Sequence, residues 1–269
     1  MIPMEYEDII QRNIGVLDWE EQKKLRHVNI SFLGLCDQGI SPVLAAKIGF
    51  NKVNLIDCER VEINNLNSQF FATIDRISQN KTDVAKDVVR KHNPLVDCST
   101  LLIDDAVTTE MIKESLGDSH YFIISTKNPY LRILASRAAE ESDIPYIVCM
   151  DMGFKVFLAV FAGDTGFEKL TKQPSLGKKL TGDLYTAIYH YQLKFLKAVD
   201  ALLQNLEVSG DAITKSIPIA SHFVANLSIA EVVKMVIGKG KIHYAPCNYT
   251  MDLLTWKPWD LSEAIERIQ

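Results

Sequence analysis

Short apolar runs and amphipathic stretches alternate along the chain as far as about residue 161. The β-rich runs cover residues 28–33, 53–57, 97–103, 121–125 and 146–150, and the helical patterns cover 41–48, 80–91, 108–116 and 129–141. Strands that alternate with helices predict a parallel sheet with helices on both faces. We therefore expect an α/β protein with a Rossmann-like, mostly parallel sheet, to which residues 155–161 add a further strand.

The two ends of the chain differ from this middle part. Residues 6–26 precede the first strand and predict a helical arm. Residues 163–182 carry glycines, lysines and a proline, which favours a loop or mobile crossover. Helical patterns then follow at 184–206 and 218–237, with a late strand at 248–254. We expect one domain in three parts, which are an arm (1–27), the part with alternating strands and helices (28–162) and a C-terminal part (163–269).

Composition and charge narrow the class of protein. The chain is 47% hydrophobic and 23% charged, which is typical of globular proteins. A net charge of −5 without basic runs disfavours a nucleic-acid or membrane-surface partner. No apolar run reaches the roughly 18 residues of a membrane helix, and the start does not resemble a signal peptide. We therefore expect a cytoplasmic protein. Its five cysteines contain no Cys-x-x-Cys pair, which disfavours disulfides and structural zinc.

A glycine-containing loop follows the first strand, where Rossmann-like proteins bind phosphate. Gly34 and Gly39 take its outer positions, but Cys36 and Asp37 take the middle ones, where side chains crowd or repel a phosphate. A turn without any ligand explains this loop equally well. Asp57 ends the second strand about 20 residues further on, where an acidic side chain binds ribose hydroxyls. An ordinary strand-end aspartate is the alternative.

The segment that starts at Asp57 carries the most specific pattern. It reads D-C-E-R-V-E-I-N-N-L-N-S-Q, and Lys81 follows twelve residues later. The segment resembles the D-x-D-x-V-E-x-x-N-L-N-R-Q signature of ThiF, MoeB and the ubiquitin-activating enzymes, whose lysine has the same spacing. The arm around Arg12 and the pair Asn128 and Arg132 resemble further parts of this family. The resemblance therefore extends over nearly the whole chain. It implies a single domain in which residues 28–162 form the nucleotide-binding half and residues 163–269 the acceptor or dimer half.

Members of this family use ATP to activate a carboxylate, often a protein C-terminus, as an acyl-adenylate. The resemblance implies that Lys81 contacts phosphate, that Asp57 holds the ribose and that Arg12 reaches the nucleotide of a partner subunit. The last role implies a homodimer or a heterodimer with a related subunit. The implied nucleotide-binding residues are Gly34, Gly39, Asp57, Asn65, Asn67, Gln69, Lys81 and Asn128. Taken singly, each has a plain structural explanation, such as an asparagine that forms a turn.

Four positions depart from the family pattern. Lys127 stands where the family has the aspartate that holds magnesium, and an ammonium cannot ligate a hard cation. Ser68 replaces an arginine, while Cys36 and Asp37 replace glycines. Magnesium is therefore doubtful, and we assign no metal ligand. Asp37 and Lys127 are expected to pair if the pocket has been emptied.

Three hypotheses follow. The first is an ATP-dependent adenylyltransferase that acts on the carboxylate of a peptide or small carrier protein. The second is a degenerate member, either a binding module or the inactive half of a heterodimer. The third is an enzyme that uses a nicotinamide dinucleotide on the same fold.

Overall fold

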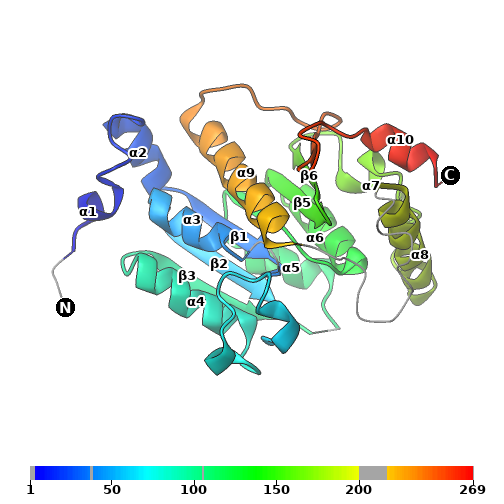
Figure 1. Cartoon of the computed structure of the whole chain (residues 1–269), viewed down its shortest axis with the longest axis horizontal. Helices are drawn as coiled ribbons and strands as arrows, with labels where there is room; N and C mark the ends of the chain where they lie inside the picture. Colours follow the sequence, from blue (N-terminus) through cyan, green and yellow to red (C-terminus); the bar gives the residue numbers. More distant parts are fainter. Residues whose placement is uncertain (1–3, 37–38, 105, 200–216, 269) are drawn as a thin grey trace.

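A computed structural model describes residues 4–36, 39–104, 106–199 and 217–268 of the protein. A sheet of seven strands lies at its centre, with helices around it (Figure 1). Its strand order is β3-β2-β1-β4-β5-β6-β7. The first five strands are parallel, and β6 and β7 are antiparallel to their neighbours. The strands are β1 (Asn29–Leu33), β2 (Lys52–Asp57), β3 (Asp97–Leu102), β4 (Tyr121–Ile124), β5 (Tyr146–Met152), β6 (Lys155–Phe161) and β7 (Tyr249–Asp252). The expected α/β, mostly parallel architecture is thus confirmed.

Helices cover both faces of this sheet (Figure 1). One face packs against α3 (Ser41–Ile48), α4 (Lys81–His92) and α9 (Pro218–Ile237), which share one apolar cluster with it. The second cluster joins the other face to α5 (Thr109–Leu116), α6 (Pro129–Glu141), α7 (Phe167–Leu170), α8 (Gly182–Val199) and α10 (Leu261–Glu266). The arm consists of α1 (Tyr6–Ile10) and α2 (Trp19–Arg26).

The strand order creates a switch point between β1 and β4. From β1 the chain builds the sheet first outward to β2 and β3, and then in the opposite direction to β4 and β5. Ligands of open parallel sheets bind outside the carboxyl ends of the strands at such a point. Gly34 follows β1, Asp57 ends β2 and Lys127 follows β4, so the topology brings these three positions to one edge.

The segment at 163–182 differs most from its sequence-based prediction. The structure places the short helix α7 there rather than only a loop or mobile crossover. Glu168 is buried and forms a double ion pair with Arg137 of α6, with oxygen–nitrogen distances of 2.6 and 2.9 Å. The Ser175 hydroxyl donates a further hydrogen bond of 2.5 Å to the same carboxylate. These contacts anchor the segment on α6.

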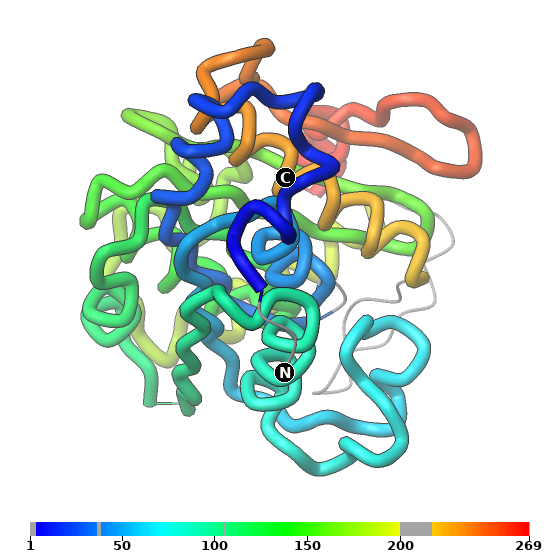
Figure 2. Tube along the Cα trace, turned by 90° about the vertical axis from the view of Figure 1, so that its left-hand side faces the viewer, coloured from blue at the N-terminus to red at the C-terminus, as the bar shows by residue number. Residues whose placement is uncertain are grey.

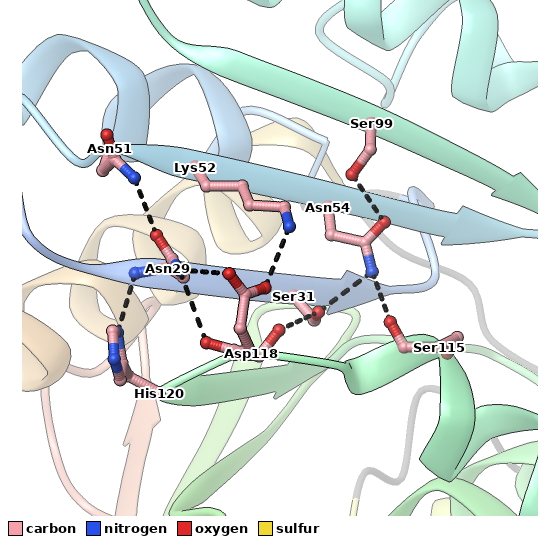
Figure 3. A network of polar contacts seen from close by, with 10 residues as sticks. Asn29, Ser31, Asn51, Lys52, Asn54, Ser99, Ser115, Asp118 and His120 are labelled. Atoms are coloured by element: carbon pink, nitrogen blue, oxygen red, sulfur yellow. Dashed lines mark hydrogen bonds and ion pairs between the residues drawn. The ribbon is translucent and has the colours of Figure 1, made fainter.

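A polar network crosses the face of β1, β2 and β3 (Figure 3). The pairing of the strands sets Asn54 beside Ser31 and Ser99, and the Asn54 amide group donates 3.1 Å to Ser31 and accepts 3.0 Å from Ser99. At the end of the strands, Asp118 accepts from Lys52 at 2.9 Å and from Asn29 at 2.8 Å. The network therefore fixes the turn between α5 and β4 to the sheet.

α9 is the most apolar helix of the described part of the chain. By length and composition alone it is long and apolar enough to cross a membrane, but 44% of its apolar 18-residue stretch is buried inside the fold. Core helices of soluble proteins meet the same criteria, because a helix that packs on a sheet and on neighbouring helices is apolar on several sides.

Candidate functional site

The turn after β1 depends on two glycines. Gly34 has a φ of +87°, and a Cβ atom there would lie 2.7 Å from backbone atoms of Ser125 and Thr126. Gly39 lies against the Phe71 ring, which a Cβ atom would approach to 2.3 Å. Both glycines thus allow close packing around the switch point. Whether they also approach a phosphate stays a prediction.

Asp57 connects this turn to the segment that follows β2. Its buried carboxylate accepts the backbone N–H of Leu35 at 2.5 Å and that of Glu59 at 2.8 Å, one on each oxygen. Burial raises the pKa of Asp57, while Lys81 and the two backbone donors act in the opposite direction. The carboxylate therefore holds the shape of the site. A ribose contact would use the lone pairs that remain.

Lys81 is the first residue of α4, and its side chain is directed into the site rather than outward. The side chain is only 2% exposed, and its ammonium forms an ion pair with Glu59. Burial by itself lowers the pKa of this ammonium. Nearby acidic groups, among them the carboxylates of Asp57 and Glu59, outweigh burial and leave the pKa raised, so the ammonium is charged at neutral pH.

The three amide side chains of the signature segment lie in different environments. The Asn65 amide oxygen accepts the backbone N–H of Glu62 at 2.9 Å and shapes a 3₁₀ turn. Asn67 is exposed. Gln69 is 4% exposed, and its buried Oε1 has no hydrogen-bond partner among the described residues. Because a buried acceptor without a donor is costly, Gln69 is the amide of the three that most needs a ligand.

The turn after β4 completes the site. Lys127 is half-buried and lowers the pKa of the Cys36 thiol, in opposition to the stronger effect of burial, so its charge acts on the turn after β1. Asn128 caps α6 by accepting the backbone N–H groups of Tyr130 and Leu131, both at 3.0 Å. That capping role explains Asn128 without a ligand. The expected partner of Lys127, Asp37, lies outside the described residues.

Arg132 connects this turn to α8. The buried guanidinium donates to the backbone oxygen of Thr126 at 2.7 Å and to Oε1 of Gln192 at 3.2 Å. Burial lowers its pKa to about 10. The sequence identified Arg132 through the family resemblance, but it gave no signal for the contact with Gln192, sixty residues away.

The structure does not bring Arg12 to this edge of the sheet. Arg12 is exposed on the arm, and neighbouring residues of the arm attach to the end of α3 through Tyr6 to Gly49 (2.9 Å) and Asn13 to Ile48 (3.3 Å). An eight-residue helix is about 12 Å long, and α3 runs from the site to the opposite edge of the sheet. The arm and the segment at 58–80 also lie apart in Figure 1 and Figure 2. Arg12 therefore has no contact with the site of its own chain.

The residues do not fit the magnesium site that the family resemblance implies. Lys127 offers no oxygen ligand, and the buried Lys81 ammonium already places a positive charge near Asp57. Glu59 is engaged by Lys81. In the described part of the chain, no three His, Cys, Asp or Glu side chains are grouped so that they could hold a metal ion. We therefore assign no step to a metal.

Comparison with known proteins identifies the class. The model of the ThiF family matches residues 10–266, so the chain belongs to the ThiF family. Among curated proteins, the tRNA threonylcarbamoyladenosine dehydratase of Haemophilus influenzae is 29% identical over 102 residues. That match covers 38% of each chain, well under two thirds of the relative.

Two solved structures share the fold. PaaA is 21% identical with a TM-score of 0.67, and the match covers 94% of this chain and 77% of PaaA. MccB of E. coli, solved with ATP, is 18% identical with a TM-score of 0.66, and the match covers 88% of this chain and 64% of MccB. At these identities the two likenesses establish the fold.

Proposed function

We propose that this chain binds ATP at the switch point and uses it to activate a carboxylate as an acyl-adenylate. The observation that carries the proposal is the buried, charged Lys81 beside Asp57 and the turn at Gly34. A charged ammonium in a buried setting is suited to an anionic ligand, and the unpartnered Oε1 of Gln69 can accept a hydrogen bond from a nucleotide. Membership of the ThiF family agrees with this chemistry.

In the proposed reaction, a carboxylate oxygen of the substrate attacks the α-phosphorus of ATP. The bond between the α-phosphorus and the oxygen that bridges it to the β-phosphorus breaks, and pyrophosphate leaves with that electron pair. Lys81 neutralises charge on the phosphates, and Lys127 adds a second positive charge on the β4 side of the site. Fixed positive charges of this kind stabilise the transition state of phosphate chemistry without a covalent role. Asp57 keeps the turn and Lys81 in position.

The substrate that we propose is the carboxylate of a peptide or of a small carrier protein. The name of the dehydratase relative refers to a modified nucleoside of tRNA, and the threonylcarbamoyl group of that nucleoside also carries a carboxylate. A net charge of −5 disfavours a polyanion such as tRNA here. We further propose the cytoplasm as the location, from the composition of the chain.

Loss of the magnesium ligand supports a second candidate, a member that binds ATP but does not adenylate. Lys127 and Ser68 depart from the family pattern, and Ser68 is a buried residue next to Gln69 in the chain. A nicotinamide dinucleotide is the weakest candidate, because the chain belongs to the ThiF family.

An ATP titration with and without magnesium tests the proposal. Because the site offers ammonium groups rather than free carboxylates, we expect the ATP affinity to change less than about twofold when magnesium is added. Calorimetry measures both affinities. ATP–pyrophosphate exchange with candidate peptides then separates the two main candidates, since a non-adenylating member binds ATP without exchange. Absence of ATP binding in both titrations would contradict nucleotide binding itself.

Arg12 is proposed to serve the site of a second subunit. We expect Arg12→Ala to lower the exchange rate about tenfold or more, because one charge contact with the phosphates is lost. The measurement mixes Arg12→Ala with Lys81→Met after both have been dissociated and reassociated. If the subunits share sites, the mixture regains part of the activity that neither variant has alone. A mixture no more active than its components contradicts the proposal, and Lys24→Ala, at an exposed position of the same arm, is the matched control.

A further inference from the structure

The ion pair between Lys81 and Glu59 joins two side chains with very different freedom. Lys81 is only 2% exposed, whereas the side chain of Glu59 is 50% exposed. The ammonium is therefore fixed inside the site, and the carboxylate reaches it from the solvent side. The Glu59 side chain can rotate away into the solvent, but the Lys81 side chain has no such alternative position.

The other acidic groups near Lys81 are held in place. Asp57 is buried, and each of its oxygens accepts a backbone N–H, at 2.5 and 2.8 Å. The buried Cys36 thiol points at the same Glu59 oxygen that Lys81 contacts, with a sulfur–oxygen distance of 3.9 Å. Of the three groups, Glu59 is thus the one that can leave without disturbing the turn after β1.

We propose that the Glu59 carboxylate takes the place of a phosphate at Lys81, and that its displacement sets the affinity of the site for polyphosphates. This inference rests on the proposed function in that it places the nucleotide phosphates at Lys81. A buried ammonium is strongly disfavoured without a counter-charge, so an acidic side chain must pair with it whenever no ligand does. Each phosphate that binds must break this ion pair and also tolerate the displaced negative charge nearby.

The ligand class follows from this exchange. A polyanion competes with Glu59 for the ammonium, but an uncharged nucleoside has no reason to displace it. Neutralising Glu59 is therefore expected to strengthen the binding of ATP and of inorganic tripolyphosphate. The binding of adenosine is expected to stay the same.

Calorimetric titration with inorganic tripolyphosphate, without metal ions, tests the inference. We expect Glu59→Gln to bind tripolyphosphate about tenfold or more tightly than the unchanged protein, which corresponds to about 1.4 kcal/mol. Glu62→Gln removes the same charge from an exposed position in the same segment, and it should change the affinity less than about twofold. Adding Lys81→Met to Glu59→Gln should remove the gain.

Two further results make the outcome decisive. If Glu59→Gln does not fold, Glu59→Asp is used, whose shorter side chain pairs less well with Lys81 and should give a smaller gain of a few fold. Unchanged, weaker or absent tripolyphosphate binding in the folded variant overturns the inference. If Glu59→Gln gains affinity for tripolyphosphate, but ATP binds no more tightly than tripolyphosphate and no pyrophosphate exchange occurs, the inference is supported and the proposed function is rejected. If the unchanged protein catalyses ATP–pyrophosphate exchange but Glu59→Gln gains no affinity for tripolyphosphate, the proposed function is supported and the inference is rejected.

Discussion

Replacing Lys81 by methionine is expected to weaken ATP binding about a hundredfold and to lower any ATP–pyrophosphate exchange by about three orders of magnitude. The ammonium is a buried positive charge beside Asp57, and loss of one such contact typically costs a few kcal/mol of transition-state stabilisation. Methionine has a volume similar to that of lysine. The Glu59 side chain is half-exposed, so it can rotate into the solvent when its partner is removed. The melting temperature should fall by only a few degrees, because the buried Asp57 loses a nearby counter-charge but keeps its two backbone N–H donors. Calorimetry and an exchange assay measure the two effects.

The matched control is Lys91→Met, which removes the same charge from an exposed position near the other end of α4. It should leave ATP affinity and the exchange rate within about twofold of the unchanged protein, as expected for a solvent-screened charge. Equal losses in both variants would indicate a general effect of net charge. Full ATP affinity in Lys81→Met would show that the phosphates bind elsewhere.

Replacing Gly34 by alanine is expected to destabilise the fold by roughly 3–5 kcal/mol and to lower the melting temperature by about 10 °C. Two effects add at this position. The φ of +87° is unfavourable for a residue with a Cβ atom, and that atom would lie 2.7 Å from the backbone of Ser125 and Thr126. Backbone atoms at the end of β4 cannot turn aside as a flexible side chain can. Thermal unfolding followed by circular dichroism measures the shift.

Gly177→Ala separates the two effects. Gly177 also has a positive φ, of +70°, but a Cβ atom there would meet nothing within 4 Å. Its cost is expected to be only about 1 kcal/mol, or roughly 3 °C, from the backbone conformation alone. Similar shifts in both variants would mean that the turn at Gly34 has room for a side chain.

Much of the fold was predictable from local patterns. Residues 41–48, 129–141 and 218–237 form helices at the predicted bounds, because their apolar spacing is regular and proline or glycine marks their ends. The predicted helix at 184–206 corresponds to α8, described as Gly182–Val199, and its last predicted residues lie outside the described residues. α7 and α10 were not predicted, since four and six residues give too little periodicity to recognise.

The candidate site was predictable in its positions but not in its contacts. The family pattern selected Asp57 and Lys81, and the strand order brings both to the edge of the sheet that also holds Gly34. The pattern gave no indication that Glu59 pairs with Lys81, or that Asn128 serves as a helix cap. Both contacts depend on the orientation of side chains in the folded protein, which the spacing of residues along the sequence does not determine.

By itself, the sequence determined the alternation of strands and helices, membership of the ThiF family and the departures at Lys127 and Ser68, because these follow from residue type and spacing along the chain. The tertiary structure decided which side chains share a site. It buried Lys81 against Glu59, used both oxygens of Asp57 to hold the turn and left Arg12 near the opposite edge of the sheet. The physical reason is that burial and charge pairing arise between residues far apart in sequence, which meet only when the strands take their order in the sheet.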